Sequence, residues 1–208
     1  MTLSEIEQTA PGVWKITPSG GSAFFFRDAY LVSLSPDQLE EVRYASFPLE
    51  LADEPYKDML SAALSYNAER MAMAYLARAE QCRTALTAKL SKKGCAGRDI
   101  AAALDYLEAC GYLDDRRFAG AWLRSRSIDH AEGRRRLAAE LAARGIARED
   151  AQAALDEFFS DHDEGELCRK ALARGMRTCR DRDKLFRALL RKGFTATEIS
   201  AAMRDTAE

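Results

Sequence analysis

Hydrophobic positions recur with a fixed spacing around three glycines in the later three quarters of the chain. Leucines lie eight and four residues before Gly94, Gly145 and Gly193, and apolar residues follow one, six and ten residues after each of them. Leucines four apart share one face of a helix. A glycine suits the left-handed position just beyond a helix C-terminus. Each copy therefore predicts two helices joined by a turn, the second packing back on the first.

The intervals between these copies leave room for one further helix each. Their apolar residues predict helices over 56–80, 115–127 and 164–175, and we expect Leu60, Leu64, Met71 and Tyr75 to form the inward face of the first. No proline follows Pro55, so nothing after it removes a helix N–H. The sequence predicts three tandem three-helix repeats over 57–111, 112–160 and 161–208. Since one unit alone buries little apolar surface, we expect them to stack into an elongated, curved array.

The first 56 residues predict a small module with a β-hairpin and a short helix. Residues 13–17 alternate as a strand, 18–21 have turn composition, and both 23–26 and 30–32 can return beside the first strand. Ser35 and Pro36 resemble a helix N-cap followed by proline at the first helical position. The run of phenylalanines at 24–26 is either core or a partner-binding patch. We favour core, because a small sheet needs one.

Composition restricts the class of protein. The chain has 31 basic and 33 acidic residues, a net charge of -2, so it is not a uniformly basic nucleic-acid coat. Residues 1–60 carry 4 basic and 10 acidic side chains, which leaves 27 and 23 for the remainder. The longest uncharged run, 16–26, is too short to cross a bilayer, and the N-terminus lacks the pattern of a signal peptide. We expect a cytoplasmic protein whose five cysteines are reduced.

Catalytic motifs are scarce. The sequence contains no phosphate-binding glycine loop, and its two histidines accompany no nucleophile motif. Asp114 and Asp115 are the one paired-carboxylate candidate, either as caps of the following helix or as metal or acid–base groups. Capping is the simpler interpretation, since Gly111 ends the preceding helix. We predict no catalytic residue, no metal site and no cofactor.

Cationic residues cluster in two segments. Residues 116–148 hold nine arginines against three acids, and residues 169–192 hold ten basic residues against two. Helical spacing predicts two outward stripes, one through Arg117 and Arg124 and one through Lys184, Arg187 and Arg191. Three arginines at 134–136 lie near a helix start, where the helix dipole disfavours cations, which suggests another use. Such charge runs are either solvated faces or contacts to a polyanion. The candidates for partner or DNA binding are Arg117, Arg124, Arg126, Arg134, Arg135, Arg136, Lys184, Arg187 and Arg191.

These segments also carry a family resemblance. The run GYLDDRRFA at 111–119, followed by RRRL at 134–137 and ELAARGI at 140–146, closely resembles the RecX family of bacterial recombination regulators. The runs LSKKG at 90–94 and LRKGF at 190–194 are similar to repeat motifs of that family, and the resemblance covers about residues 61–208.

The resemblance implies a cofactor-free cytoplasmic protein of tandem three-helix repeats. Such proteins bind the RecA recombinase filament and inhibit its ATPase, coprotease and strand-exchange activities, and so regulate homologous recombination, DNA repair and the SOS response. DNA is implied as a secondary partner. The family supplies no catalytic residues.

Other functions stay open beside this one. A stand-alone DNA-binding protein could use the basic faces of the tri-helical repeats, although its cations are spread over two repeats and its N-terminal module is acidic. An enzyme or a purely structural scaffold are the further alternatives. We expect a monomer, because the repeats cover one another's apolar faces.

Overall fold

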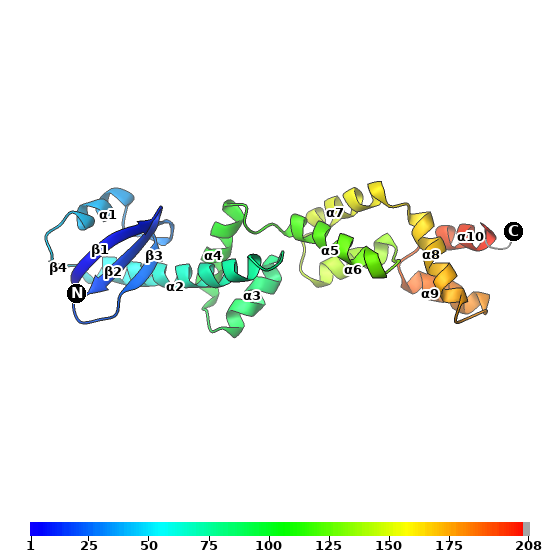
Figure 1. Cartoon of the computed structure of the whole chain (residues 1–208), viewed down its shortest axis with the longest axis horizontal. Coiled ribbons are helices and arrows are strands. Elements are labelled where there is room, and N and C mark those ends of the chain that lie inside the picture. The colour runs from blue at the N-terminus through cyan, green and yellow to red at the C-terminus, as the bar shows by residue number, and fades with distance from the viewer. Residues whose placement is uncertain (206–208) are drawn as a thin grey trace. The chain divides into compact units, whose positions relative to one another are not determined.

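The computed structural model describes residues 1–205, which form a small sheet and a long series of helices (Figure 1). The chain divides into two compact units, one of Met1–Ala79 with Leu86–Leu113 and one of Glu80–Ala85 with Asp114–Glu208. The strands are β1 (Thr2–Ala10), β2 (Val13–Pro18), β3 (Phe24–Arg27) and β4 (Leu49–Glu50). The helices are α1 (Pro36–Arg43), α2 (Asp53–Leu76), α3 (Arg83–Lys92), α4 (Gly97–Ala109), α5 (Asp115–Asp129), α6 (Arg134–Ala143), α7 (Arg148–Asp161), α8 (Glu164–Met176), α9 (Arg182–Arg191) and α10 (Ala196–Asp205).

The N-terminal sheet is larger than the predicted hairpin. Its strands are antiparallel in the order β3-β2-β1-β4, and β1 had not been predicted. Trp14 and Phe26 are register partners in the buried core of the sheet. That core is completed by residues of α1 and α2. The three phenylalanines at 24–26 were expected in the core, and this is confirmed for Phe26, which is inaccessible to solvent. Phe25 instead is 40% exposed.

The expected strand over 30–32 is wrong. A short 3-10 helix occupies Asp28–Tyr30 instead. The carboxylate of Asp58 on α2 then accepts the backbone N–H groups of Val32 and Ser33 at 2.9 and 2.8 Å, which satisfies donors that a sheet would otherwise use. The short helix after Ser35 is confirmed, with a reciprocal capping box between Ser35 and Gln38.

The inward face of α2 also differs from the prediction. Leu60 and Leu64 are 38% and 57% exposed, and the buried side of the helix carries small residues such as Ala62, Ala68 and Ala72. Glu69 is buried on the same side because Arg27 of β3 neutralises it. Small side chains let β3 and α4 approach α2 closely, so the helix packs through alanine instead of leucine.

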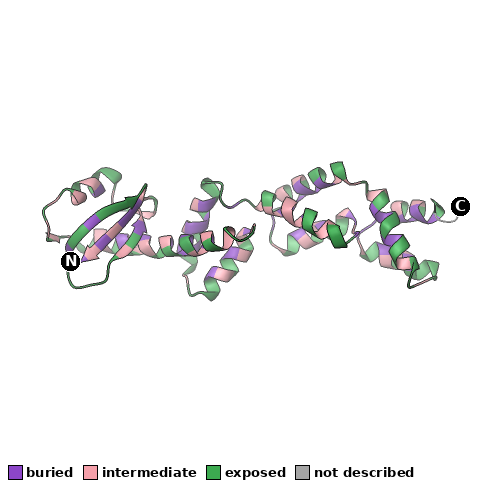
Figure 2. Ribbon diagram, viewed as in Figure 1, coloured by how far each residue is buried: buried purple, intermediate pink, exposed green. Residues whose placement is uncertain are grey.

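The three-helix pattern beyond the sheet agrees with the glycine spacing. We refer to α2–α4, α5–α7 and α8–α10 as the first, second and third helix triplets. Gly94, Gly145 and Gly193 each follow the middle helix of a triplet with positive φ values of 86°, 79° and 90°. Within residues 57–205 the structure contains no strand. Buried residues lie on the faces that the helices of each unit turn toward one another (Figure 2).

Two glycine turns in the second unit each accept a hydrogen bond from the residue just before a preceding middle helix. The backbone N–H of Gly133, twelve residues before Gly145, donates to the carbonyl of Lys192, just before Gly193. A Cβ atom on Gly193 would collide with the backbone nitrogen of Arg136. The thiol of Cys82, twelve residues before Gly94, likewise donates to the carbonyl of Arg144, just before Gly145. The N-terminal end of the middle helix of one triplet therefore contacts the glycine turn that follows the middle helix of the next triplet.

Candidate partner and nucleic-acid interface

Charge is distributed unevenly over the second unit. Arginines gather on α5 and α6, and ten cations lie at residues 169–192, on α8, on α9, in their connection and at the C-cap of α9. The intervening α7 is acidic, with two carboxylates in its first turn and three more along its length. A polyanion would therefore approach the helices on either side of α7. The nine candidate cations separate into two groups according to whether a carboxylate already pairs with them.

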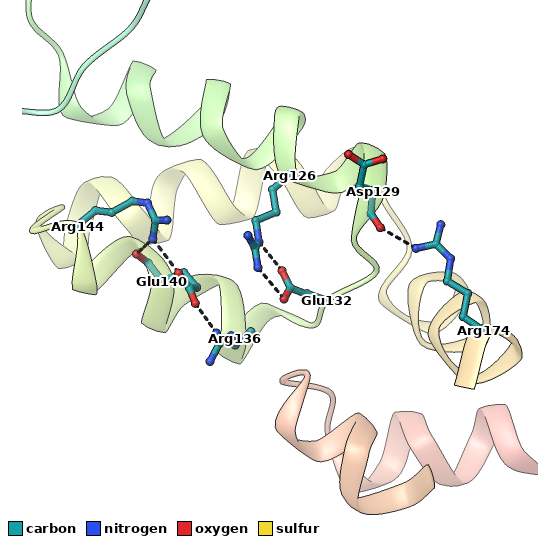
Figure 3. A network of polar contacts seen from close by, with 7 residues as sticks. All are labelled: Arg126, Asp129, Glu132, Arg136, Glu140, Arg144 and Arg174. Atoms are coloured by element: carbon teal, nitrogen blue, oxygen red, sulfur yellow. Dashed lines mark hydrogen bonds and ion pairs between the residues drawn. The ribbon is translucent and has the colours of Figure 1, made fainter. Parts of the chain in front are cut away.

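Arg126 belongs to the paired group. Its Nε and Nη2 donate to the two carboxylate oxygens of Glu132 at 2.7 and 3.0 Å, and both side chains are largely buried (Figure 3). The guanidinium of Arg126 also lies 5.5 Å from the ring centre of Trp122. The guanidinium of Arg144 lies 4.4 Å from the same ring centre. This is a cation–π arrangement that fixes α5 to α6. Arg126 thus has a structural role.

Arg136 continues the same network. It pairs with Glu140 one turn later, and Glu140 also accepts from Arg144 at 2.8 Å (Figure 3). The hydrogen bond from Arg144 lowers the pKa of Glu140. Partial desolvation opposes this effect, and the positive charges of Arg136 and Arg144 add to it. The carboxylate therefore stays ionised between two cations, which leaves Arg136 less available to a partner.

Arg134, Arg117 and Lys184 have acidic partners too. Arg134 bridges Asp156 of α7 and Glu164 of α8 and lies 4.7 Å from the ring centre of Phe159. Arg117 is exposed, as an outward stripe requires, but it donates to Glu80 at 2.7 Å, a partner 37 residues earlier, so it is not an unpaired cation. Lys184 lies 3.5 Å from Asp181, but its side chain is 75% exposed. Surface pairs of this kind contribute little and exchange readily.

The remaining candidates form the unpaired group, which comprises Arg124, Arg135, Arg187 and Arg191. All four are exposed, and none has an acidic partner among the described residues. On α9, Leu185 and Leu189 are buried while Arg187 and Arg191 are solvent-exposed, as the spacing predicts. Residue spacing also did not single out Lys170, Arg177, Arg180 and Arg182, which the charge count included and which are likewise exposed without a carboxylate partner among the described residues.

An open groove of about 450 Å³ runs beside α5. Arg116, Arg117 and Arg124 line it, together with Gly120 and two carboxylates. Gly120 has no side chain, and Nη1 of Arg124 comes to 3.3 Å from the position that a Cβ atom there would occupy. Arg124 therefore lies along the helix with unpaired donors toward the groove. Such a groove can accept a phosphate or carboxylate oxygen.

The paired aspartates at the start of α5 act as caps. Asp114 accepts the backbone N–H of Arg117 at 2.9 Å, and Asp115 accepts that of Arg83 at 2.8 Å. The capping interpretation is confirmed for Asp114 at the start of α5, whereas Asp115 accepts the first N–H of α3 and so caps a different helix from the predicted one. The part of the chain that the structure describes holds no group of three or more potential metal ligands. Over the same residues, no helix combines the length and hydropathy that a membrane span requires.

Comparison with known proteins gives consistent matches. A profile of the second three-helix domain of RecX matches residues 114–155, which cover α5, α6 and the first part of α7. The regulatory protein RecX of Treponema pallidum is 38% identical over 147 residues, 71% of this chain and 90% of that protein. That of Chromohalobacter salexigens is 36% identical over 136 residues, 64% of this chain and 88% of that protein.

Two solved structures share the fold. A crystal structure of regulatory protein RecX aligns with a TM-score of 0.75 at 21% identity, over 98% of both chains. The crystal structure of RecX from Lactobacillus salivarius aligns with a TM-score of 0.60 at 20% identity, over 68% of this chain and 96% of that one. The first alignment includes the N-terminal sheet, so a solved protein shares that part of the fold.

Proposed function

Because this chain belongs to the RecX family of regulatory proteins, we propose that it binds the filament of the RecA recombinase on DNA and inhibits its ATPase, coprotease and strand-exchange activities. The observation that supports this most is the exposed stripe Lys184, Arg187 and Arg191 on α9. Arg187 and Arg191 have no carboxylate partner within residues 1–205, and Lys184 has only a loose one. A nucleoprotein filament is a polyanion that would pair with them.

The stripe is also energetically separable from the fold. Its three residues lie at i, i+3 and i+7, so their like charges repel in the free protein. A polyanionic partner relieves this repulsion, while the buried leucines of α9 hold the helix in place without the stripe. Replacement of the three residues should therefore change binding and leave folding intact.

The test is co-sedimentation with RecA filaments, with and without DNA. The triple variant Lys184→Ala, Arg187→Ala, Arg191→Ala should keep its melting temperature and bind at least tenfold more weakly, a loss of about 1.4 kcal/mol. A matched control removes three exposed cations of the first unit, through Lys57→Ala, Arg70→Ala and Arg78→Ala. If both variants bind and inhibit as the parent does, at low and at moderate salt, the stripe is a solvated face.

A stand-alone DNA-binding function is the second candidate. The unpaired Arg124 at the α5 groove and the exposed Arg135 favour it, because both can contact phosphates without breaking an ion pair. A salt titration on bare duplex and single-stranded DNA separates the two functions. Tight binding without RecA, with a steep loss of affinity as salt rises, would make DNA the main target.

We further propose that the protein acts as a cytoplasmic monomer without a cofactor, and that its helical units divide near the predicted boundaries at residues 111 and 160. The predicted boundary at residue 56 falls inside α2. Gel filtration with light scattering tests the first point, and limited proteolysis tests the boundaries, since cleavage should concentrate at the connections between the triplets.

A further inference from the structure

A small cavity lies between α8 and α9 in the third helix triplet. Its volume is about 220 Å³, and its apolar lining comes from Ala171, Gly175, Leu185, Ala188 and Leu189. Three of these five residues are alanine or glycine, so the space exists because side chains are small at those positions. A cavity of about 150 Å³ can hold a benzene molecule. One leucine or phenylalanine side chain therefore fits.

Two cations complete the lining, Arg174 from α8 and Lys192 from the end of α9. Nη1 of Arg174 donates to the backbone carbonyl of Asp129 at 2.8 Å, which holds the guanidinium in place without neutralising it (Figure 3). The backbone of Lys192 is fixed as well, since its N–H donates to Ala188 and its carbonyl accepts from Gly133. The ammonium has no carboxylate partner within residues 1–205.

The surroundings are strongly cationic. No lining residue is acidic, and between residues 169 and 192 only Asp181 and Asp183 oppose ten basic side chains. An apolar floor beside two cations without carboxylate partners favours a ligand that presents an apolar group next to anionic oxygens. A phosphate backbone would use the cations and leave the apolar floor empty. A nucleobase would bring polar edges against alanine and leucine walls that offer no hydrogen bonds.

From these observations we infer that the cavity binds an acidic peptide segment of another protein, with one large apolar side chain inserted between α8 and α9 and flanking carboxylates on Arg174 and Lys192. An anchor side chain in a desolvated pocket with a charged rim is a common arrangement at the centre of protein interfaces. This inference goes beyond the proposed function, because it rests on the cavity alone and uses none of the stripe residues of α9.

The direct test is fluorescence anisotropy with the full chain and a fluorescein-labelled peptide of sequence Asp-Glu-Asp-Phe-Glu-Asp. We expect saturable binding that is at least tenfold weaker when the phenylalanine is replaced by serine. Ala188→Phe fills the cavity without changing charge and should weaken binding at least tenfold. Lys192→Glu should do the same and reduce the salt dependence. Lys170→Glu, an equal charge change at an exposed residue of α8 outside both the lining and the stripe, should change binding no more than threefold.

Three results would overturn the inference. The serine peptide could bind as tightly as the parent peptide, or Lys170→Glu could weaken binding as much as Lys192→Glu. Single-stranded DNA could also bind the parent and lose affinity on Ala188→Phe as strongly as the peptide does. Circular dichroism establishes whether Ala188→Phe folds. If it does not, the serine peptide and the two charge variants decide alone. Loss of RecA binding in the stripe variant with peptide binding intact would separate this site from the proposed function.

Discussion

Arg27 of β3 and Glu69 of α2 form a two-point ion pair, in which Nε and Nη2 donate to the carboxylate oxygens at 2.8 and 2.6 Å. The two side chains are only 15% and 6% exposed. Tyr30 donates its hydroxyl to the same carboxylate, and the guanidinium lies 4.6 Å from the ring centre of Tyr106 on α4. Burial and the hydrogen bond to Glu69 raise the pKa of Tyr30, which keeps it a donor. The cluster joins the sheet to α2 and α4 within the first unit.

Removal of Glu69 should strongly destabilise the first unit. Glu69→Ala leaves Arg27 buried without its counter-charge, and we expect a loss of about 3–5 kcal/mol in the free energy of unfolding. The fluorescence of Trp14 during urea unfolding, in a Trp122→Phe background, reports on this unit alone. Replacement of the exposed neighbour Arg70 by Ala should cost less than about 0.5 kcal/mol. Equal effects of the two substitutions would mean that the buried pair adds nothing to stability.

The Asp58 carboxylate should make the first unit acid-sensitive. Burial alone would raise its pKa, but hydrogen bonds from Ser33, Val32 and Leu34 outweigh this and lower the pKa. Because the pKa of Asp58 is lower in the folded protein, its stabilising effect is complete at pH values above the pKa of the unfolded state, about 3.9. The effect is lost as the pH falls through the pKa of the folded state. The stability difference between the parent and Asp58→Asn should therefore shrink between pH 6 and pH 3. A constant difference would contradict this assignment.

Leu141 anchors the middle helix of the second triplet. Its side chain is inaccessible in the core shared by the second and third triplets. Leu141→Ala should cost about 2–5 kcal/mol, measured by urea unfolding with Trp122 as the probe in a Trp14→Phe background. Leu190→Ala, at a leucine that is 42% exposed, is the matched control and should stay within about half a kilocalorie. A small effect at Leu141 would place that helix face in solvent.

The five thiols should differ in reactivity. Cys110 is exposed, while Cys168 is inaccessible and its pKa is raised to about 11, mainly by burial and further by Glu198. A thiolate is the reactive form. At pH 8 a disulfide reagent should label Cys110 rapidly in the native protein and Cys168 only after denaturation. Labelling of both at one rate would show that the third triplet opens readily.

The sequence predicted the helical part of the fold better than the sheet. Glycine spacing fixed the middle helices because the left-handed turn at Gly94, Gly145 and Gly193 is a local requirement. The strand β1 escaped prediction because Leu3 and Ile6 alone are buried in it, so its alternation is weak. The inward face of α2 was misassigned because the burial of Glu69 depends on Arg27, which lies 42 residues away.

The sequence predicted which cations belong to the candidate interface. It did not predict which of them lack a carboxylate partner. Spacing along α9 was sufficient for Arg187 and Arg191, whose surroundings are set by their own helix. It failed for Arg117, whose partner Glu80 precedes it by 37 residues. The position of Arg134 near a helix start likewise did not show that it pairs with carboxylates on two other helices. Pairing across helices is a tertiary property, so only the structure separates fixed cations from available ones.

The contact between Gly133 and the turn at Gly193 has a consequence for how such a chain can evolve. Cys82 of the first triplet and Gly133 of the second each donate to the glycine turn of the next triplet, and both residues lie twelve positions before the glycine of their own triplet. In the third triplet the equivalent position is Asp181, whose side chain is 45% exposed. The glycines are 51 and 48 residues apart, so a duplicated segment of that length would contain one glycine turn. That turn could contact Asp181, and the segment would also contain a residue equivalent to Asp181. Duplication of one such segment would add a triplet while the contact between Gly133 and the turn at Gly193 is kept.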